Sequence, residues 1–126
     1  MNKILVVDDD AILRTLLVRL LKKIKKDFQI MTAADGCMAL EALKVTPVDL
    51  VLTDYQMPEM DGMEAFTEIK KLYPDLPIIM MSGYGDDKLS KVFLQAGGAG
   101  FIKKPFCPDE LNLKVQSVLE EKKKSL

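Results

Sequence analysis

Histidine is absent from this sequence of 126 residues. Its absence excludes Ser-His-Asp and Cys-His nucleophilic arrangements within the chain, and it excludes every metal site built on an imidazole ligand. Any histidine that takes part in the chemistry must come from another molecule. Cysteine is scarce as well, since Cys37 and Cys107 are the only two and lack a CxxC spacing. We therefore expect neither a disulfide framework nor a zinc site.

Long apolar runs are also missing. No stretch approaches the roughly 18 apolar residues of a membrane span, and no basic leader with a cleavage site precedes the first strand-like run. We expect a cytoplasmic protein that does not enter a membrane. The charge is nearly balanced, with 18 Lys and Arg against 19 Asp and Glu, so no overall positive field favours direct binding of nucleic acid.

The length and the composition fit one domain over residues 1–126, because a chain of this size that is 48% hydrophobic can build one core. Short apolar runs alternate with longer amphipathic segments, which is typical of repeated βα units. The expected strands are 3–7, 29–33, 50–54, 77–81 and 100–103, and the expected helices are 11–25, 36–44, 63–72, 86–96 and 108–123. The pattern predicts an α/β fold with a doubly wound, five-stranded parallel sheet.

Two of the expected helices have clear apolar faces. The face of the first helix comprises Ile12, Leu13, Leu16, Leu20 and Ile24, and that of the last comprises Leu111, Val115, Val118 and Leu119. Leu113 lies nearly opposite the second face at 100° per residue. It is a candidate contact for a partner, although a single exposed leucine is ordinary on a protein surface.

Charged residues follow three of the expected strands: Asp8, Asp9 and Asp10 after the first, Asp54 at the end of the third, and Lys103 and Lys104 at the end of the fifth. In a doubly wound sheet, ligands bind outside the carboxyl ends of the strands where the strand order reverses. Two carboxylates about 4 Å apart repel by roughly 4 kcal/mol at an effective dielectric constant of 20, which Mg²⁺ can offset. Helix capping is the simpler explanation of the acidic run, but one cap needs only one side chain. Phosphoryl chemistry is therefore the leading hypothesis.

A longer motif sharpens this hypothesis. Asp54 opens the segment D-x-x-M-P-x-M-D-G, and Lys104 is followed by Pro105 and Phe106. Together with the paired acids after the first strand, these features resemble the receiver domain of two-component response regulators, over essentially the whole chain. The resemblance implies a flavodoxin-like (βα)5 three-layer sandwich with the strand order 2-1-3-4-5.

The resemblance also implies a site. Asp54 corresponds to the phosphoryl acceptor, which can act as a carboxylate nucleophile. Asp9 corresponds to the main Mg²⁺ ligand, Asp8 supports it directly or through water, and Gln56 offers its backbone carbonyl. Gln56 and Tyr84 stand at positions that tune hydrolysis in the family.

Three more residues match the family at the fourth and fifth strands. Lys104 corresponds to the lysine that pairs with the phosphoryl oxygens, and the bond to Pro105 can be cis; Lys103 is its rival, although it fits a solvated strand position better. Ser82 corresponds to the hydroxyl residue that hydrogen-bonds the phosphoryl group, with turn capping as the alternative. Phe101 corresponds to the switch aromatic, although an apolar ring in a strand is also ordinary core.

The resemblance implies a signalling function rather than turnover of a separate substrate. Asp54 would take a phosphoryl group from a phosphohistidine of a histidine kinase or a histidine phosphotransfer protein. The added charge would then alter a surface made of the fourth helix, the fifth strand and the fifth helix. That surface would bind a downstream protein or a missing output domain, with the chain a monomer or a weak dimer through it.

Three other functions compete with this one. Asp8 and Asp10 form the D-x-D pair of a dehalogenase-type phosphatase, but the chain is short for that fold and the motif after Asp54 would be unexplained. A receiver-like binding module that works without phosphorylation would not need the acids, Ser82 and Lys104. A flavin-binding domain would need a Ser/Thr-rich phosphate loop where this chain has aspartates, which would repel the phosphate.

Overall fold

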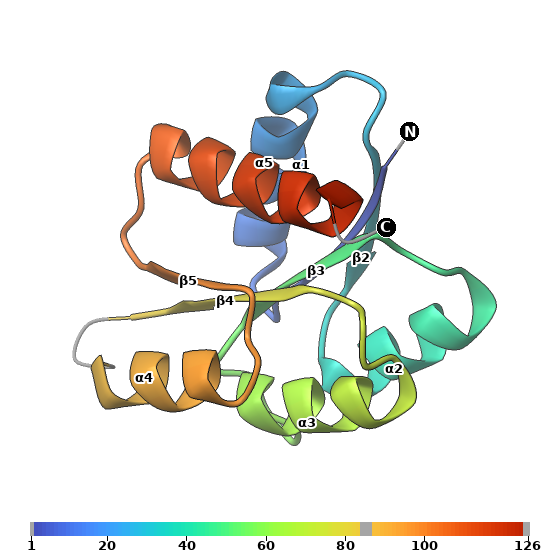
Figure 1. Cartoon of the computed structure of the whole chain (residues 1–126), viewed down its shortest axis with the longest axis vertical. Helices are drawn as coiled ribbons and strands as arrows, with labels where there is room; N and C mark the ends of the chain where they lie inside the picture. The colour runs from blue at the N-terminus through green and yellow to red at the C-terminus, as the bar shows by residue number, and fades with distance from the viewer. Residues whose placement is uncertain (1, 84–86, 125–126) are drawn as a thin grey trace.

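The computed structural model describes residues 2–83 and 87–124, with side chains described as far as residue 121. Five strands alternate with five helices in this part of the chain, as the sequence predicts (Figure 1). The strands are β1 (Lys3–Val7), β2 (Gln29–Ala33), β3 (Leu50–Asp54), β4 (Ile78–Ser82) and β5 (Gly100–Lys103). The helices are α1 (Ala11–Ile24), α2 (Gly36–Val45), α3 (Gly62–Leu72), α4 (Asp87–Gln95) and α5 (Pro108–Lys124).

The predicted boundaries agree closely with these elements. One difference affects a predicted site residue. β4 begins and ends one residue later than predicted, so Ser82 is the last residue of the strand rather than the first residue of a loop. The predicted start of the fourth helix at Asp86 lies outside the described residues.

The sheet is parallel throughout and has the strand order β2-β1-β3-β4-β5, which confirms the predicted fold class. β1 pairs with β2 on one side and with β3 on the other. Helices α1 and α5 cover one face of the sheet, and α2, α3 and α4 cover the other (Figure 1). The strand order therefore reverses beside β1, and the carboxyl ends of β1 and β3 flank a crevice.

Alternating side chains of the central strands fill two separate cores. Ile4 and Val6 of β1 pack beneath α1 and α5, whereas Leu5 and Val7 pack against α2, α3 and α4. All four are at most 1% exposed. A strand covered on both faces is apolar at every position, which explains why these strands read as continuous apolar runs in the sequence.

The apolar face predicted for α1 is partly wrong. Ile12 and Leu16 are 83% and 46% exposed, and the fully buried residues are Leu17 and Leu21. Leu13, Leu20 and Ile24 lie against the core at its edge. The helix is apolar around more than half of its circumference, so periodicity alone could not tell which edge of that wide face meets the sheet.

Helix ends follow their sequence signals. Asp10, Asp35 and Asp61 cap α1, α2 and α3, and each accepts at least one hydrogen bond from a backbone N–H group of the first turn. In α5 the predicted stripe is buried, and Leu113 is 72% exposed on the other side, as predicted.

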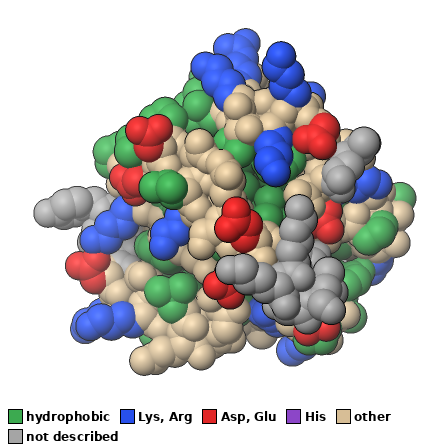
Figure 2. All heavy atoms as spheres, turned by 45° about the horizontal axis from the view of Figure 1, so that its top comes forward, with side chains coloured by type: hydrophobic (Ala, Val, Ile, Leu, Met, Phe, Trp, Pro, Cys, Tyr) green, Lys and Arg blue, Asp and Glu red, His purple; other side chains and the backbone are tan. Residues whose placement is uncertain are grey.

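Charges of both signs are interspersed over the face shown in Figure 2, with Lys and Arg side chains gathered near its top. Within the described part of the chain, none of the helices combines the length and the apolar character that a membrane crossing requires.

Candidate functional site

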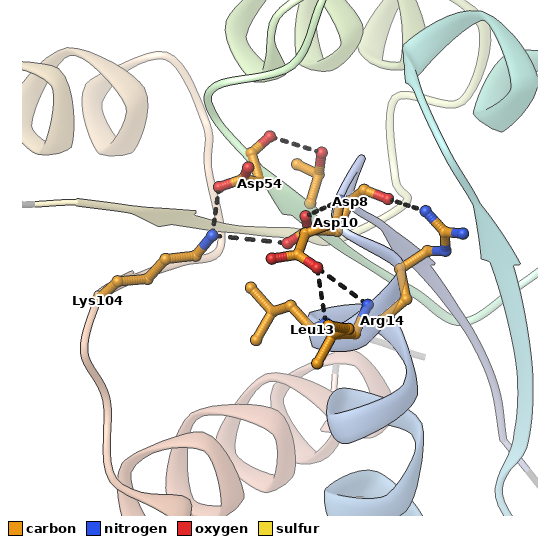
Figure 3. Close-up of polar contacts among 8 residues, drawn as sticks. Asp8, Asp10, Leu13, Arg14, Asp54 and Lys104 are labelled. Carbon is orange, nitrogen blue, oxygen red and sulfur yellow. Dashed lines mark hydrogen bonds and ion pairs between the residues drawn. The ribbon is translucent and has the colours of Figure 1, made fainter.

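The charged strand ends meet at one edge of the sheet, as predicted. Asp8 follows β1 directly, Asp54 is the last residue of β3, and Lys104 follows β5 (Figure 3). An open pocket of about 780 Å³ lies over them. Its lining residues are Asp8, Asp9, Asp10, Leu13, Asp54, Tyr55, Gln56, Met57, Pro58, Asp61, Gly83 and Lys104.

Lys104 is the cation of this pocket. Its Nζ donates a hydrogen bond to Asp54 Oδ1 at 2.8 Å and lies 3.5 Å from Asp8 Oδ2 (Figure 3). The peptide bond to Pro105 is cis. Lys103 points elsewhere, because its exposed side chain forms an ion pair with Asp87 of α4 and thereby lowers the pKa of that carboxyl. The structure thus brings Lys104, and not its neighbour, to Asp54.

The acidic residues of the pocket are grouped closely enough to hold a cation. Asp8, Asp9 and Asp54 each offer a carboxylate oxygen, and these atoms lie within 4.8 Å of one another. Asp8 Oδ2 is buried and accepts no hydrogen bond from the described residues. Carboxylate oxygens at the edge of an open pocket, with room for water and phosphate oxygens, fit the way in which Mg²⁺ is held.

The acidic group is costly to the fold without such a cation. Burial raises the pKa of Asp8, against the hydrogen bond from the Asp10 backbone, and the charge of Asp54 raises it further. Burial likewise raises the pKa of Asp54, although its hydrogen bond with Lys104 opposes the shift. Lys104 supplies one positive charge to three carboxylates, so the pocket keeps an excess of negative charge that a divalent cation would offset.

Asp10 has a different task from its two neighbours. Its Oδ1 accepts hydrogen bonds from the N–H groups of Ile12 at 2.9 Å and Leu13 at 3.3 Å, which makes it the N-cap of α1. The capping explanation is therefore correct for one of the three aspartates. A carboxylate occupied in this way is poorly placed to serve as the general acid that a D-x-D phosphatase needs.

Of the remaining predicted residues, Gln56 lines the pocket, whereas Ser82 and Phe101 are not among its lining residues. Gln56 is exposed, and Ser82 is buried at the end of β4, with its backbone carbonyl accepting the N–H of Lys104 at 2.6 Å. Phe101 is half-buried, and its ring centroid lies 6.3 Å from that of Phe93 in α4. Tyr84 lies outside the described residues.

Two residues of the site went unrecognised in the sequence. Arg14 of α1 donates a hydrogen bond to the carbonyl oxygen of Asp8 at 2.6 Å (Figure 3). Gly62, at the start of α3, donates its N–H to Tyr55 O at 2.7 Å, and a Cβ there would lie 2.5 Å from Asp54 O. The sequence offered one weak signal for each. Arg14 is a cation within a mostly apolar segment, and Gly62 ends the D-x-x-M-P-x-M-D-G motif, but neither feature predicts a particular contact.

Comparison with known proteins gives the same family as the motifs. Residues 4–116 match the family described as "Response regulator receiver domain". The chain is 39% identical to the chemotaxis protein CheY of Bacillus subtilis (strain 168), over 87% of this chain and 91% of that protein. It is 33% identical to the cyclic di-GMP phosphodiesterase response regulator RpfG of Xanthomonas campestris pv. campestris, over 97% of this chain but 33% of that protein.

Solved structures agree with the sequence relatives. A response regulator receiver domain protein from Clostridium thermocellum superposes with a TM-score of 0.92 and 26% identity, with all of both chains covered. The chain spans between about a quarter and a half of the length of several curated relatives that it matches, which include transcriptional regulators. Receiver domains bind Mg²⁺ at an acidic cluster, and Asp8, Asp9 and Asp54 form such a cluster here. This chain therefore belongs to the response regulator receiver domain family, and its role is that of a phosphoacceptor in signalling.

Proposed function

We propose that Asp54 accepts a phosphoryl group from a phosphohistidine of a histidine kinase or a histidine phosphotransfer protein. The observation that carries the proposal is the convergence of Asp54, Lys104 and the paired acids on one open pocket, with Lys104 Nζ 2.8 Å from Asp54 Oδ1. The chain has no histidine, so the donor imidazole belongs to the partner.

The residues of the pocket divide the reaction between them. Lys104 binds one oxygen of Asp54 and leaves the other to attack phosphorus, while the bond from phosphorus to the partner's imidazole nitrogen breaks and that nitrogen keeps the electron pair. The same ammonium group can shift to the phosphoryl oxygens as their charge develops. Asp8, Asp9 and Asp54, with the backbone carbonyl of Gln56, would hold Mg²⁺. When bound, Mg²⁺ neutralises charge on the transferring group.

The phosphorylated state should change one surface of the molecule. A phosphoryl group adds a charge of about −1.5 to −2 and three acceptor oxygens, which draw Lys104 and the Ser82 hydroxyl toward it. Ser82 ends β4 and pairs with Lys103 of β5, and half-buried Phe101 of β5 lies beside Phe93 of α4, so we expect movement at Ser82 to be passed to β5 and from there to α4. We propose that α4, β5 and α5 form the switched surface, through which the chain binds a partner or a second copy weakly.

Exposed apolar side chains on that surface give a partner something to bind. Val92 and Leu94 of α4 are 54% and 45% exposed, and Leu113 of α5 is 72% exposed. The partner is a downstream protein or an output domain joined to this one. Relatives named as transcriptional regulators or as a phosphodiesterase are longer than this chain, and we assign no such activity to the receiver domain itself. It modifies only its own aspartate, turns over no separate substrate and makes no direct contact with nucleic acid.

The acceptor can be tested with a small phosphodonor. Incubation with acetyl phosphate and Mg²⁺, followed by intact mass measurement, should show one phosphate-sized adduct on the wild type and on Asp10→Asn, and none on Asp54→Asn. Circular dichroism checks that both variants fold. An equal adduct on Asp54→Asn, or none on the wild type, would sink the mechanism. Loss of reaction in Asp10→Asn alone would favour the phosphatase alternative.

The two lysines at the end of β5 form a matched pair for a second test. Lys104→Met should slow phosphorylation by about 10²-fold, because it removes the charge that stabilises the developing phosphoryl charge. Lys103→Met should leave the rate unchanged, since Lys103 pairs with Asp87 outside the pocket. The measurement is the initial rate of adduct formation at a fixed concentration of acetyl phosphate, and equal slowing in both variants would contradict the assignment.

A further inference from the structure

Arg14 is a cation beside the acidic pocket that the proposed reaction does not use. It lies half-buried near the start of α1, where the helix dipole does not favour a positive charge. Its Nη1 donates to the carbonyl oxygen of Asp8 at 2.6 Å, and the guanidinium forms no ion pair with any carboxylate among the described residues. Among the described residues, the hydrogen bond to Asp8 is thus the one polar contact that the guanidinium makes.

The bonded carbonyl belongs to the peptide group that joins Asp8 to Asp9. Because a peptide group is planar, holding its oxygen also fixes the direction in which the chain enters Asp9. Two further bonds hold the same segment: Asp8 N–H donates to Ala33 O at 3.1 Å, and Asp10 N–H donates to Asp8 Oδ1 at 2.9 Å. Arg14 therefore completes a set of bonds around Asp8 that leaves its buried Oδ2 without a hydrogen bond from the described residues, 3.5 Å from Lys104 Nζ.

The position of Arg14 separates its effect from that of Lys104. The guanidinium lies on the opposite side of the Asp8 backbone from Lys104 (Figure 3), and Arg14 is absent from the lining of the pocket. It does not occupy the carboxylate oxygens that a metal ion would use. A hydrogen bond donated by a charged group is stronger than a neutral one, so this anchor suits a segment that carries two mutually repelling carboxylates.

We propose that Arg14 is a positioning residue of the metal site, which holds the Asp8–Asp9 peptide so that both carboxylates are presented before Mg²⁺ binds. The inference rests on the proposed function, because it assumes that the acidic cluster binds Mg²⁺. Residues that orient metal ligands typically contribute 10-fold to 100-fold to metal affinity.

The test measures Mg²⁺ affinity of the folded protein without any phosphodonor. Titration of ¹⁵N-labelled protein with MgCl2, followed by NMR, should give a dissociation constant about 10-fold higher for Arg14→Met than for the wild type. Arg14→Lys should be intermediate, because it keeps the charge but lacks the planar donor fork. Arg19→Met, at an exposed position of the same helix, is the control and should match the wild type.

The readout distinguishes positioning from a general effect on stability. A merely structural role would lower the urea midpoint in chelator but leave the Mg²⁺ dissociation constant of the folded variants unchanged. Unchanged affinity in Arg14→Met, or in Arg14→Lys if the first variant does not fold, overturns the inference while the proposed function stands. Failure of the wild type to bind Mg²⁺ overturns both.

Discussion

Three consecutive aspartates in this chain have three different environments. Asp8 is 1% exposed and directs one oxygen into the pocket, Asp9 is exposed beside it, and Asp10 caps α1. Burial removes water from Asp8 and thus raises its pKa. Asp10 lies at the start of α1, where its carboxylate accepts hydrogen bonds from backbone N–H groups. Identical side chains in consecutive positions therefore differ in burial, in electrostatic cost and in their part in helix formation.

The Asp8 carboxylate should make the metal-free protein less stable as the pH rises. Burial raises its pKa in the fold above the ordinary value of 3.8, so the folded state binds the proton more tightly than the unfolded state does. The contribution of Asp8 to the free energy of unfolding therefore falls as the pH rises from about 3.8 through the raised pKa, and it stays low above that value.

Asp8→Asn isolates this contribution. The amide keeps an oxygen that can accept a hydrogen bond from Asp10 N–H, but it carries no charge. In chelator at neutral pH the variant should therefore be more stable than the wild type, and this difference in the free energy of unfolding should shrink as the pH falls. Urea unfolding in chelator at several pH values measures the difference, with Asp27→Asn at an exposed position as control. A wild type that is the more stable protein at neutral pH would contradict the prediction.

At the scale of elements, two helices approach the sheet where a glycine removes a side chain. Gly62 begins α3 directly against the carbonyl of Asp54. Gly98, between α4 and β5, leaves room for the ring of Phe93, which is fully buried and in edge contact with Phe66 at 4.8 Å between centroids. The first contact joins α3 to the strand that carries Asp54, and the second joins α4 to α3.

Gly62→Ala should disturb both stability and the site. The added Cβ would lie 2.5 Å from Asp54 O and 2.8 Å from Tyr55 Cα, and backbone atoms cannot swing aside. We expect a loss of about 1–3 kcal/mol in the free energy of unfolding, and slower phosphorylation, because the strand end that carries Asp54 must move. Urea unfolding measures the loss. Gly83→Ala is the stability control, since a Cβ there meets nothing within 4 Å; equal effects of the two would refute the steric argument.

Gly98 and Phe93 should be energetically coupled. A Cβ at Gly98 would overlap the ring of the fully buried Phe93, so Gly98→Ala creates a steric clash, and Phe93→Leu alone opens a cavity. Together the two changes compensate in part, and we expect the double variant to be more stable than the sum of the single losses by about 0.5–3 kcal/mol. Urea unfolding of the wild type, the two single variants and the double variant gives the coupling energy. Strictly additive losses would contradict the proposed clash between residue 98 and the ring of Phe93.

At the scale of the whole molecule, the parallel sheet concentrates charge. Because its strands run the same way, Asp8, Asp54 and Lys104 collect at one edge over the crevice, while both faces of the sheet stay apolar beneath helices. The acids repel one another in the metal-free state, and the fold bears that cost. Binding of a cation should therefore be visible as global stabilisation rather than only as a local change.

Mg²⁺ should raise the unfolding midpoint of the wild type. A ligand at about 100 times its dissociation constant stabilises the folded state by roughly 2.7 kcal/mol. Thermal unfolding in MgCl2 and in chelator measures the gain. Asp54→Asn should lose most of it, because one of the three grouped carboxylates is gone, and Asp27→Asn should keep it. An unfolding midpoint of the wild type that is the same in MgCl2 and in chelator would contradict the proposal that the acidic cluster binds Mg²⁺.

Local sequence patterns determined much of this protein. Apolar runs with no polar residue at alternate positions predicted buried parallel strands, helix caps marked the helix starts, and a specific motif pointed to Asp54 as the acceptor. Such signals act between neighbours in the chain, so they can be recognised without knowing how distant segments meet. The five strands, their order and the pocket edge followed from them and from the family resemblance.

Only the tertiary structure decided which of several similar residues are buried and which side chains contact one another. The Lys104 to Asp54 bond joins residues 50 positions apart, so the preference for Lys104 over Lys103, which came from the family resemblance, could be checked only in the fold. The exposure of Ile12 and the hydrogen bond from Arg14 depend on the rotation of α1 against the sheet, and the burial of Asp8 beside its exposed neighbour depends on its place at the end of β1. The physical reason is common to these cases. The sequence contains the periodicity and the type of the residues, whereas burial and side-chain contacts depend on which residues of a distant segment pack against them.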